Sequence, residues 1–374
     1  MRQPATPHHF HYIIPVWGRV FSQLFAEICL PMLLTKGNLK ASADRPFDRF
    51  VIVTTWDDWA YMRKTPAIKT LLTIMKVEPI LINGVIDTTN PHEAMSKCYD
   101  LAMRSKAVVP GKTYFIFLTP DSIWSEGAFK RLMELADQGY KVAMVGSLRA
   151  NQETMSKILI EWLKKHPENP EMYAPKMMDM IFDHLHQLSR AHNFLSSTEF
   201  LNVWPSHVYW INDQDRQIVA HCFHMHPLMV LAPKGITKIG NTIDGDFLDK
   251  LPYPLKSYYV VQDDFMGFDM APSERNWGQK LGPPSIRAIK TFSMLYVNPK
   301  HWHFFTKRIT FSPDPDLKVP PEITAFVDGV VKRVCAQRYK SHLMQLFVKI
   351  ASVFALQGLL LRVLRKIRRL LIRN

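Results

Sequence analysis

Residues 113–118 read Thr113-Tyr114-Phe115-Ile116-Phe117-Leu118, and the polar turn Thr119-Pro120-Asp121-Ser122 follows them directly. A nearly continuous apolar run of this length, ended by a turn, is typical of a strand that is buried on both faces, as in a parallel sheet. The same design recurs upstream at residues 10–14, before Pro15-Val16-Trp17-Gly18, and at residues 49–55, before Trp56-Asp57-Asp58. These segments predict buried strands that end in loops.

Predicted strands alternate with helical segments along the first 150 residues. Strands are expected at 10–14, 49–55, 78–82, 113–118 and 141–146, and helices at 20–34, 67–75, 91–103 and 127–136. This alternation predicts an α/β fold with a mostly parallel, Rossmann-like sheet and helices on both faces. Ligands of such sheets bind at the carboxyl ends of the strands. Those ends carry no G-x-G-x-x-G or Walker loop, so a dinucleotide dehydrogenase or a P-loop enzyme is not expected.

The order of these features resembles a known family. A first strand closed by a Pro-containing loop, a second strand ending in Asp, and a strand ending at Asp121 before Ser125-Glu126-Gly127 resemble the nucleotide-sugar half of GT-A glycosyltransferases. The family has an Asp-x-Asp turn at this place, whereas Thr119 stands here at its first position and only Asp121 matches. The resemblance covers about residues 10–150, and a nucleotidyltransferase has a similar layout. It implies a GT-A-like enzyme that uses a nucleotide-sugar donor.

The resemblance also implies a donor site at the strand ends. A nucleoside diphosphate leaves with negative charge, which a divalent cation or cationic side chains stabilise. Mg²⁺ or Mn²⁺ is the implied cofactor, bound through Asp121. The residues expected to bind the donor and cofactor are Pro15, Trp17, Gly18, Asp57, Asp58 and Asp121. Taken by themselves, Asp121 is also explained as the N-cap of a helix over 123–127, and Asp57 and Asp58 as turn residues.

Histidine residues mark the second half of the chain. Residues 206–212 and 217–228 alternate between polar and apolar around a polar turn and predict a hairpin. His224 and His226 on its second strand would share one face, and His-x-His is a metal-ligand spacing. The expected metal ligands are therefore Asp121, His224 and His226.

Acidic residues follow the predicted hairpin. Asp244-Gly245-Asp246 is a literal Asp-x-Asp on a turn, and Asp263-Asp264 ends another short predicted strand. The resemblance to inverting GT-A enzymes implies a general base from this half of the chain, and Asp244 or Asp246 is expected to be that catalytic residue. Two other functions remain open: a metal-dependent hydrolase and a non-catalytic membrane-docked scaffold. The hydrolase would use His221, His224, His226, Asp244 and Asp246, and a polar hairpin with satisfied histidines is the alternative without any site.

Three regions are expected. Residues 1–150 form the nucleotide-sugar half, residues 151–330 the acceptor half with a helical insertion at 151–198, and residues 331–374 a basic tail. The 374 residues carry a formal net charge of +14, yet Lys332–Asn374 holds eleven Lys or Arg and no Asp or Glu, which leaves +3 on the rest. The apolar residues of 343–371 recur at helical spacing opposite a basic stripe, which predicts an amphipathic helix on an anionic membrane surface.

The expected partners are a nucleotide-sugar donor, a glycan or lipid-linked acceptor associated with membrane or envelope, and the anionic membrane surface reached through 341–374. Nucleic acid is not expected, because aliphatic residues in the tail outnumber the aromatic residues that could stack on bases. Four scattered cysteines give no disulfide framework, and the first residues have no signal-peptide pattern. A cytoplasmic protein that associates peripherally with the membrane is the expectation.

Overall fold

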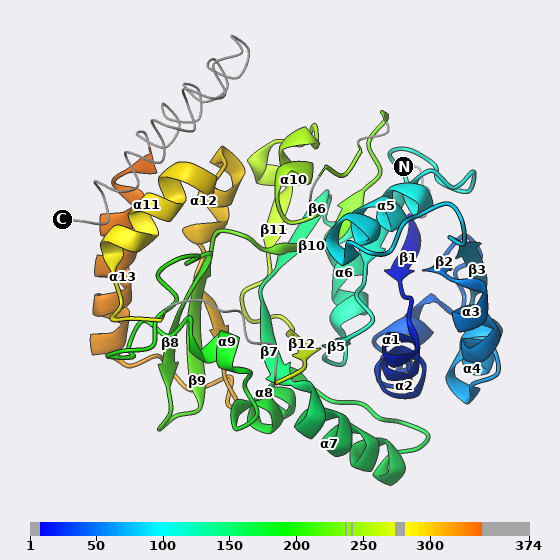
Figure 1. The fold of residues 1–374 in the computed structure, drawn as a ribbon, viewed down its shortest axis with the longest axis horizontal. Helices are drawn as coiled ribbons and strands as arrows, with labels where there is room; N and C mark the ends of the chain where they lie inside the picture. The colour runs from blue at the N-terminus through cyan, green and yellow to red at the C-terminus, as the bar shows by residue number, and fades with distance from the viewer. Residues whose placement is uncertain (1–7, 236–237, 241, 274–280, 339–374) are drawn as a thin grey trace, which may run out of the picture.

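The computed structural model describes residues 8–235, 238–240, 242–273 and 281–338. Its centre is a seven-stranded sheet in the order β11-β6-β10-β4-β1-β2-β3 (Figure 1). The strands are β1 (His9–Pro15), β2 (Arg49–Thr54), β3 (Lys76–Leu81), β4 (Thr113–Phe117), β6 (Val142–Val145), β10 (His226–Leu231) and β11 (Tyr258–Val260). β10 runs antiparallel to β4 and β6, and the other pairs are parallel. The expected α/β class with a mostly parallel sheet is confirmed.

Helices cover both faces of this sheet. The helices of the first half are α1 (Arg19–Leu24), α2 (Leu30–Leu33), α3 (Trp56–Met62), α4 (Pro66–Ile74), α5 (Pro91–Met103) and α6 (Ala128–Asp137), and a π-helical turn, Phe25–Cys29, joins α1 to α2. On one face, Tyr12 of β1 packs against Phe129 of α6. On the other, Phe117 of β4 packs against Tyr99 of α5. Alternate side chains of the strands therefore have helical cover on each side, which explains their nearly continuous apolar sequences.

Two smaller three-stranded sheets extend the molecule. One has the order β5-β12-β7, from β5 (Ser122–Trp124), β7 (Ser147–Asn151) and β12 (Gly267–Ala271). The other has the order β13-β9-β8, from β8 (His207–Asn212), β9 (Gln217–Cys222) and β13 (Ile309–Phe311). The remaining helices are α7 (Gln152–Lys165), α8 (Ala174–Phe182), α9 (Gln187–Arg190), α10 (Asp246–Lys250), α11 (Ile286–Tyr296), α12 (Pro299–Phe305) and α13 (Pro321–Cys335), with single 3₁₀ turns at Leu39–Ser42 and Leu255–Ser257.

A second hydrophobic core lies under the β13-β9-β8 sheet. Trp210, Phe223 and Trp302 are fully buried there, and α11, α12 and α13 supply the surrounding apolar residues. Although residues 272–316 are rich in proline, 286–305 forms the two helices α11 and α12. Their starts use Ser285, whose side chain accepts from the Ala288 amide, and Pro299 in the first helical turn.

The predicted hairpin at 206–228 is also different in the structure. β8 and β9 do pair antiparallel, but β9 ends at Cys222 and a separate strand, β10, begins at His226 in the central sheet. His224 and His226 therefore do not lie on one strand. Similarly, residues 122–124 after Asp121 are strand β5, so Asp121 is not the N-cap of a helix over 123–127.

The structure contains no helix, within the residues it describes, that is long and apolar enough to cross a membrane. The amphipathic helix predicted at 341–374 lies outside the described residues.

Candidate functional site

The carboxyl ends of three neighbouring strands bring the predicted donor residues to one edge of the central sheet. β1 lies between β2 and β4 and pairs in parallel with both, with Pro15 opposite Val53 and Ile13 opposite Phe117. The strand order changes direction between β1 and β4, and such switch points are where open α/β sheets bind ligands. The loop at Gly18, the start of α3 and the turn at Asp121 all leave the sheet at this edge.

Asp58 fastens two of these loops together. Its carboxylate accepts hydrogen bonds from the Gly18 amide at 2.8 Å, the Ser22 hydroxyl at 2.8 Å and the Thr55 hydroxyl at 2.6 Å. Gly18 has φ +82°, a conformation that side-chain-bearing residues rarely adopt. Asp58 is buried, whereas Asp57 and Gly18 are exposed and Trp17 is half-buried. Asp58 therefore fixes the shape of the loop after β1.

Asp121 has a carboxylate partner that the sequence did not indicate. The Asp121 carbonyl accepts from the Met270 amide at 3.0 Å, and the next residue of β5, Ser122, pairs with Asp269 of β12. Both carboxylates are half-buried. Burial first, and then the neighbouring charge of Asp269, hold the pKa of Asp121 above its usual range, and burial likewise raises the pKa of Asp269. The two carboxylates thus share a partly enclosed space that favours a compensating positive charge.

Arg149 supplies part of that charge. Arg149 of β7 is the cross-strand partner of Asp269, and its guanidinium lowers the pKa of both Asp269 and Asp121, against the effect of burial. The Ser147 hydroxyl also donates to Asp269, at 3.0 Å. The small sheet β5-β12-β7 therefore carries two carboxylates and one guanidinium at the end of β4. A signal for Asp269 does exist in the sequence, as a single charge within the apolar strand Gly267–Ala271.

The histidines and Asp244 form a neighbouring group. The charge of Asp244 raises the pKa of His224, His226 and His301, but burial outweighs it and leaves all three pKa values below the usual range. The Nε2 atom of His226 lies 2.7 Å from the Phe117 carbonyl oxygen, so this nitrogen carries the proton and donates it. At neutral pH, Asp244 is thus surrounded by uncharged imidazoles.

Asp244 and Asp246 have different surroundings, although both lie on one turn. Asp246 forms an ion pair with Lys250 at 3.0 Å, at the start of α10, and its carboxylate lies against Gly240. The Asp244 backbone carbonyl accepts from His301 Nε2 at 3.1 Å. None of the hydrogen bonds or ion pairs found among the described residues uses the Asp244 carboxylate. Asp244 is therefore the one of the two that faces the histidines.

His207 connects the two groups. Its imidazole lies near His192, with ring centroids 5.2 Å apart, and its pKa responds both to Arg149 and to Asp244. Burial lowers the pKa of His192 to about 3, so this ring too is neutral. The rings of His192 and His207 therefore lie near Arg149, and His207 also lies near enough to Asp244 for its charge to act on the ring.

The predicted metal ligands are not brought together as one set. Within the ranges that the structure describes, no three His, Cys, Asp or Glu residues are placed to hold a metal ion. Asp121 belongs to the Asp269 group, while His224 and His226 belong to the Asp244 group. His221, a ligand of the hydrolase alternative, lies elsewhere, bonded through Nδ1 to the Phe305 carbonyl at 2.8 Å and packed against Trp210.

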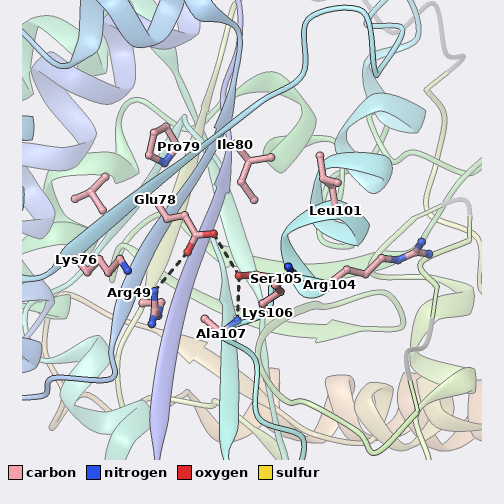
Figure 2. Close-up of a pocket in the computed structure, with 11 residues that line it drawn as sticks. Arg49, Lys76, Glu78, Pro79, Ile80, Leu101, Arg104, Ser105, Lys106 and Ala107 are labelled. Carbon is pink, nitrogen blue, oxygen red and sulfur yellow. Dashed lines mark hydrogen bonds and ion pairs between the residues drawn. The ribbon is translucent and has the colours of Figure 1, made fainter.

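A separate surface groove of about 740 Å³ lies along the outer strand β3 (Figure 2). Arg49 and Lys76, the first residues of β2 and β3, line it together with Arg104 and Lys106 beyond α5. Glu78 is neutralised inside the groove by Arg49, at 3.6 Å, and accepts from the Ser105 hydroxyl at 3.3 Å. Because Arg49 and Lys76 begin their strands, this groove opens at the amino ends, opposite the carboxylate groups.

Comparisons with known proteins were made at the level of sequence and of structure. No family model and no curated protein matches the sequence. Among solved structures, the chain is similar to S. aureus TarS, with 12% identity and a TM-score of 0.35 over 79% of this chain and 41% of TarS. It is similar to mouse xyloside xylosyltransferase 1, with 17% identity and a TM-score of 0.26 over 43% of this chain and 59% of that one.

A Bacillus anthracis protein described as a glucose-1-phosphate thymidylyltransferase is also similar, with 14% identity and a TM-score of 0.23 over 38% of this chain and 55% of that one. The chain spans less than two thirds of the length of each of these three structures. At these values the likeness is partial and concerns the fold alone.

Proposed function

We propose that the protein is a glycosyltransferase that moves a sugar from a nucleotide-activated donor to a glycoconjugate acceptor. The observation that carries the proposal is the Asp121–Asp269 pair beside Arg149, at the carboxyl end of β4 where the strand order reverses. Two half-buried carboxylates with raised pKa values are stabilised in their ionised form by a bound cation. The Arg149 guanidinium favours a bound phosphate. A nucleoside diphosphate with a divalent cation satisfies both.

The residues present fit Mg²⁺ or Mn²⁺ held jointly with the donor. Mg²⁺ is commonly bound by one or two carboxylates together with substrate phosphates, so Asp121 and Asp269 suffice without a third protein ligand. The bound ion would offset the charge that develops on the diphosphate. In this proposal Asp269 replaces His224 and His226 as the partner of Asp121, while the loop that Asp58 holds, with Pro15, Trp17, Gly18 and Asp57, encloses the nucleoside.

Asp244 is the proposed general base. The acceptor hydroxyl oxygen forms a bond to the anomeric carbon, the bond from that carbon to the diphosphate oxygen breaks, and Asp244 takes the hydroxyl proton. The electron pair of the broken bond leaves with the diphosphate, next to Arg149. His301 positions Asp244 through its backbone carbonyl, and Asp246, paired with Lys250, holds the start of α10.

The test is calorimetric titration of the protein with a panel of nucleotide sugars, with and without Mn²⁺, followed by donor turnover. We expect one donor to bind more tightly with Mn²⁺, and Asp121→Asn and Asp269→Asn each to remove the Mn²⁺ effect. Asp244→Asn should leave donor binding intact and lower turnover by 10²-fold or more, whereas Asp246→Asn should lower it far less. A chain that binds no donor, or an Asp121→Asn variant that keeps full turnover, would refute the proposal.

A membrane or envelope location of the acceptor is proposed from the sequence of residues 341–374. A chain lacking these residues should lose co-sedimentation with anionic vesicles and keep donor binding. Equal co-sedimentation of the full chain and the shortened chain would contradict peripheral membrane association.

A further inference from the structure

An aromatic platform lies next to the Asp244 group. Trp204, just before β8, and Tyr296, the last residue of α11, have ring centroids 4.8 Å apart and leave 40% and 47% of their surfaces exposed. Phe292 of α11 supports both rings, at 4.9 Å from Trp204 and 5.6 Å from Tyr296. Two exposed aromatic rings that contact each other over a shared third ring form a contiguous flat apolar surface, and contiguous apolar surface, unlike a single exposed ring, marks a binding site.

The platform is continuous with the proposed site. The Trp204 ring lies 6.3 Å from the His224 ring, which lies 4.8 Å from the His301 ring, and His301 holds the Asp244 carbonyl. The backbone of Tyr296 also bonds His224. Two imidazole contacts therefore separate the platform from the proposed base, a spacing that suits a neighbouring ring of an acceptor chain and not the ring that carries the reacting hydroxyl.

The chemistry beside the platform identifies its occupant. Trp204 and Tyr296 are exposed and carry an indole N–H and a phenol hydroxyl, which are uncharged hydrogen-bonding groups, and Lys300 of α12 points its ammonium group inward, toward the carbonyls of Leu248 and Leu251. The platform thus combines flat apolar rings with uncharged hydrogen-bonding groups. A pyranose ring has a matching character, since it presents C–H bonds on one face and neutral hydroxyls at its edge, whereas a phosphate or a charged peptide finds no counter-charge in these neighbours.

We infer that Trp204 and Tyr296 form an acceptor subsite that stacks a sugar ring of an oligosaccharide or of a larger glycan, next to the ring that receives the transferred sugar. This inference rests on the proposed function, because it gives the acceptor of that reaction its chemical class. It adds two residues that neither the fold nor the sequence motifs indicate.

The experiment uses an array of neutral oligosaccharides probed with the full-length wild-type protein and with Trp204→Ala, Trp204→Phe, Tyr296→Ala and Tyr296→Phe. The matched control is Tyr173→Ala, because Tyr173 is 60% exposed but lies beside α8, outside the platform. We expect wild type and the control to bind a common set of glycans, each alanine variant to bind them about tenfold more weakly, and each phenylalanine variant to keep most of the affinity.

Donor turnover measured in parallel separates this inference from the proposed function. Slow transfer of the donor sugar to water should be equal in wild type and in all platform variants, because the platform does not contact the donor. If the donor reacts but Trp204→Ala and Tyr296→Ala bind the same glycans as wild type, or if wild type binds none, the subsite is refuted while the transferase stands. If no donor binds or reacts, the proposed function fails first. Thermal unfolding of each variant shows whether a lost signal reflects lost folding.

Discussion

Gly267 offers the sharpest test of how the carboxylate pair is held in place. Gly267 begins β12 opposite Trp124 of β5, and a Cβ atom built on it would lie 2.5 Å from two carbon atoms of the Trp124 ring. Trp124 is only 4% exposed, so the surrounding side chains leave it little room to turn away. Gly267→Ala must therefore push β5 and β12 apart by about 1 Å to restore ordinary contact.

The expected cost follows from that displacement. Overpacking a filled interior typically costs about 1–3 kcal/mol, and the lower backbone entropy of unfolded alanine returns about 0.5–1 kcal/mol. We therefore expect the free energy of unfolding to fall by about 1–2 kcal/mol and Tm by about 1–3 °C. Because β5 and β12 carry Asp121 and Asp269 into the site, donor turnover should fall by about tenfold or more.

A second glycine provides the control. Gly329 lies in α13, is exposed, and has no atom within 4 Å of an added Cβ. The same substitution there should raise the free energy of unfolding by about 0.5–1 kcal/mol, because alanine is the better helix former, and leave turnover unchanged. Urea unfolding of both variants beside wild type measures the difference. A Gly267→Ala variant as stable as wild type, or equal losses in both variants, would show that the close contact at Trp124 does not exist in solution.

Four further outcomes are expected. Asp269→Asn should raise the free energy of unfolding at neutral pH, because a carboxylate with a raised pKa opposes folding when ionised. In urea titrations at several pH values, this gain should vanish below about pH 3–4, where the carboxyl is protonated in both the folded and the unfolded protein. A gain that is constant with pH would contradict the shared burial. Asp58→Ala should lower the free energy of unfolding by about 2–3 kcal/mol, because three hydrogen bonds are lost. The matched change at the exposed Asp57, Asp57→Ala, should lower it by about 0.5 kcal/mol or less. Gly37→Ala should lower the free energy of unfolding by about 1–3 kcal/mol in the same assay, because the added Cβ atom would lie 2.7 Å from the Gly127 backbone. Lys76→Ala in the β3 groove should change neither stability nor donor turnover measurably, and a large loss of turnover would place that groove in the reaction.

The helices and strands that could be predicted from the sequence are those whose pattern of apolar residues is continuous along the chain. Each of β1, β2 and β4 is a run of apolar residues, and the helices predicted between them have apolar faces, so their positions agree with the structure to within a few residues. The expected turn at Asp57 and Asp58 is wrong, because these residues lie in the first turn of α3, where Thr55 is the N-cap. The short strand β5 was missed because three residues give no periodic signal. The break between β9 and β10 was missed because alternation continues through Cys222–His226, and a change of sheet leaves no mark on a pattern of period two.

The partner of Asp121 depends on pairing between distant segments. Asp269 lies near Asp121 only because β12 (267–271) pairs between β5 (122–124) and β7 (147–151). No local pattern specifies such a contact, whereas His-x-His is a local pattern, so the sequence indicates the histidines and not Asp269 as metal ligands. The lone charge within the apolar strand 267–271 is the local sign of Asp269, because a charge in a half-buried strand is costly unless it has a partner.

Asp58 and Asp121 have different surroundings, although the sequence places them alike. Both follow a buried strand of the same sheet, and the sequence treats them alike. Asp58 is buried and receives three hydrogen bonds from its own chain, so its charge is already satisfied and a ligand has little to add. Asp121 instead faces a second carboxylate in a half-buried space, and its ionised form is disfavoured. A fold gains no stability from that arrangement. In the proposed function a cation bound between the two carboxylates would offset this cost, and this makes the Asp121–Asp269 pair the part of the molecule to test first.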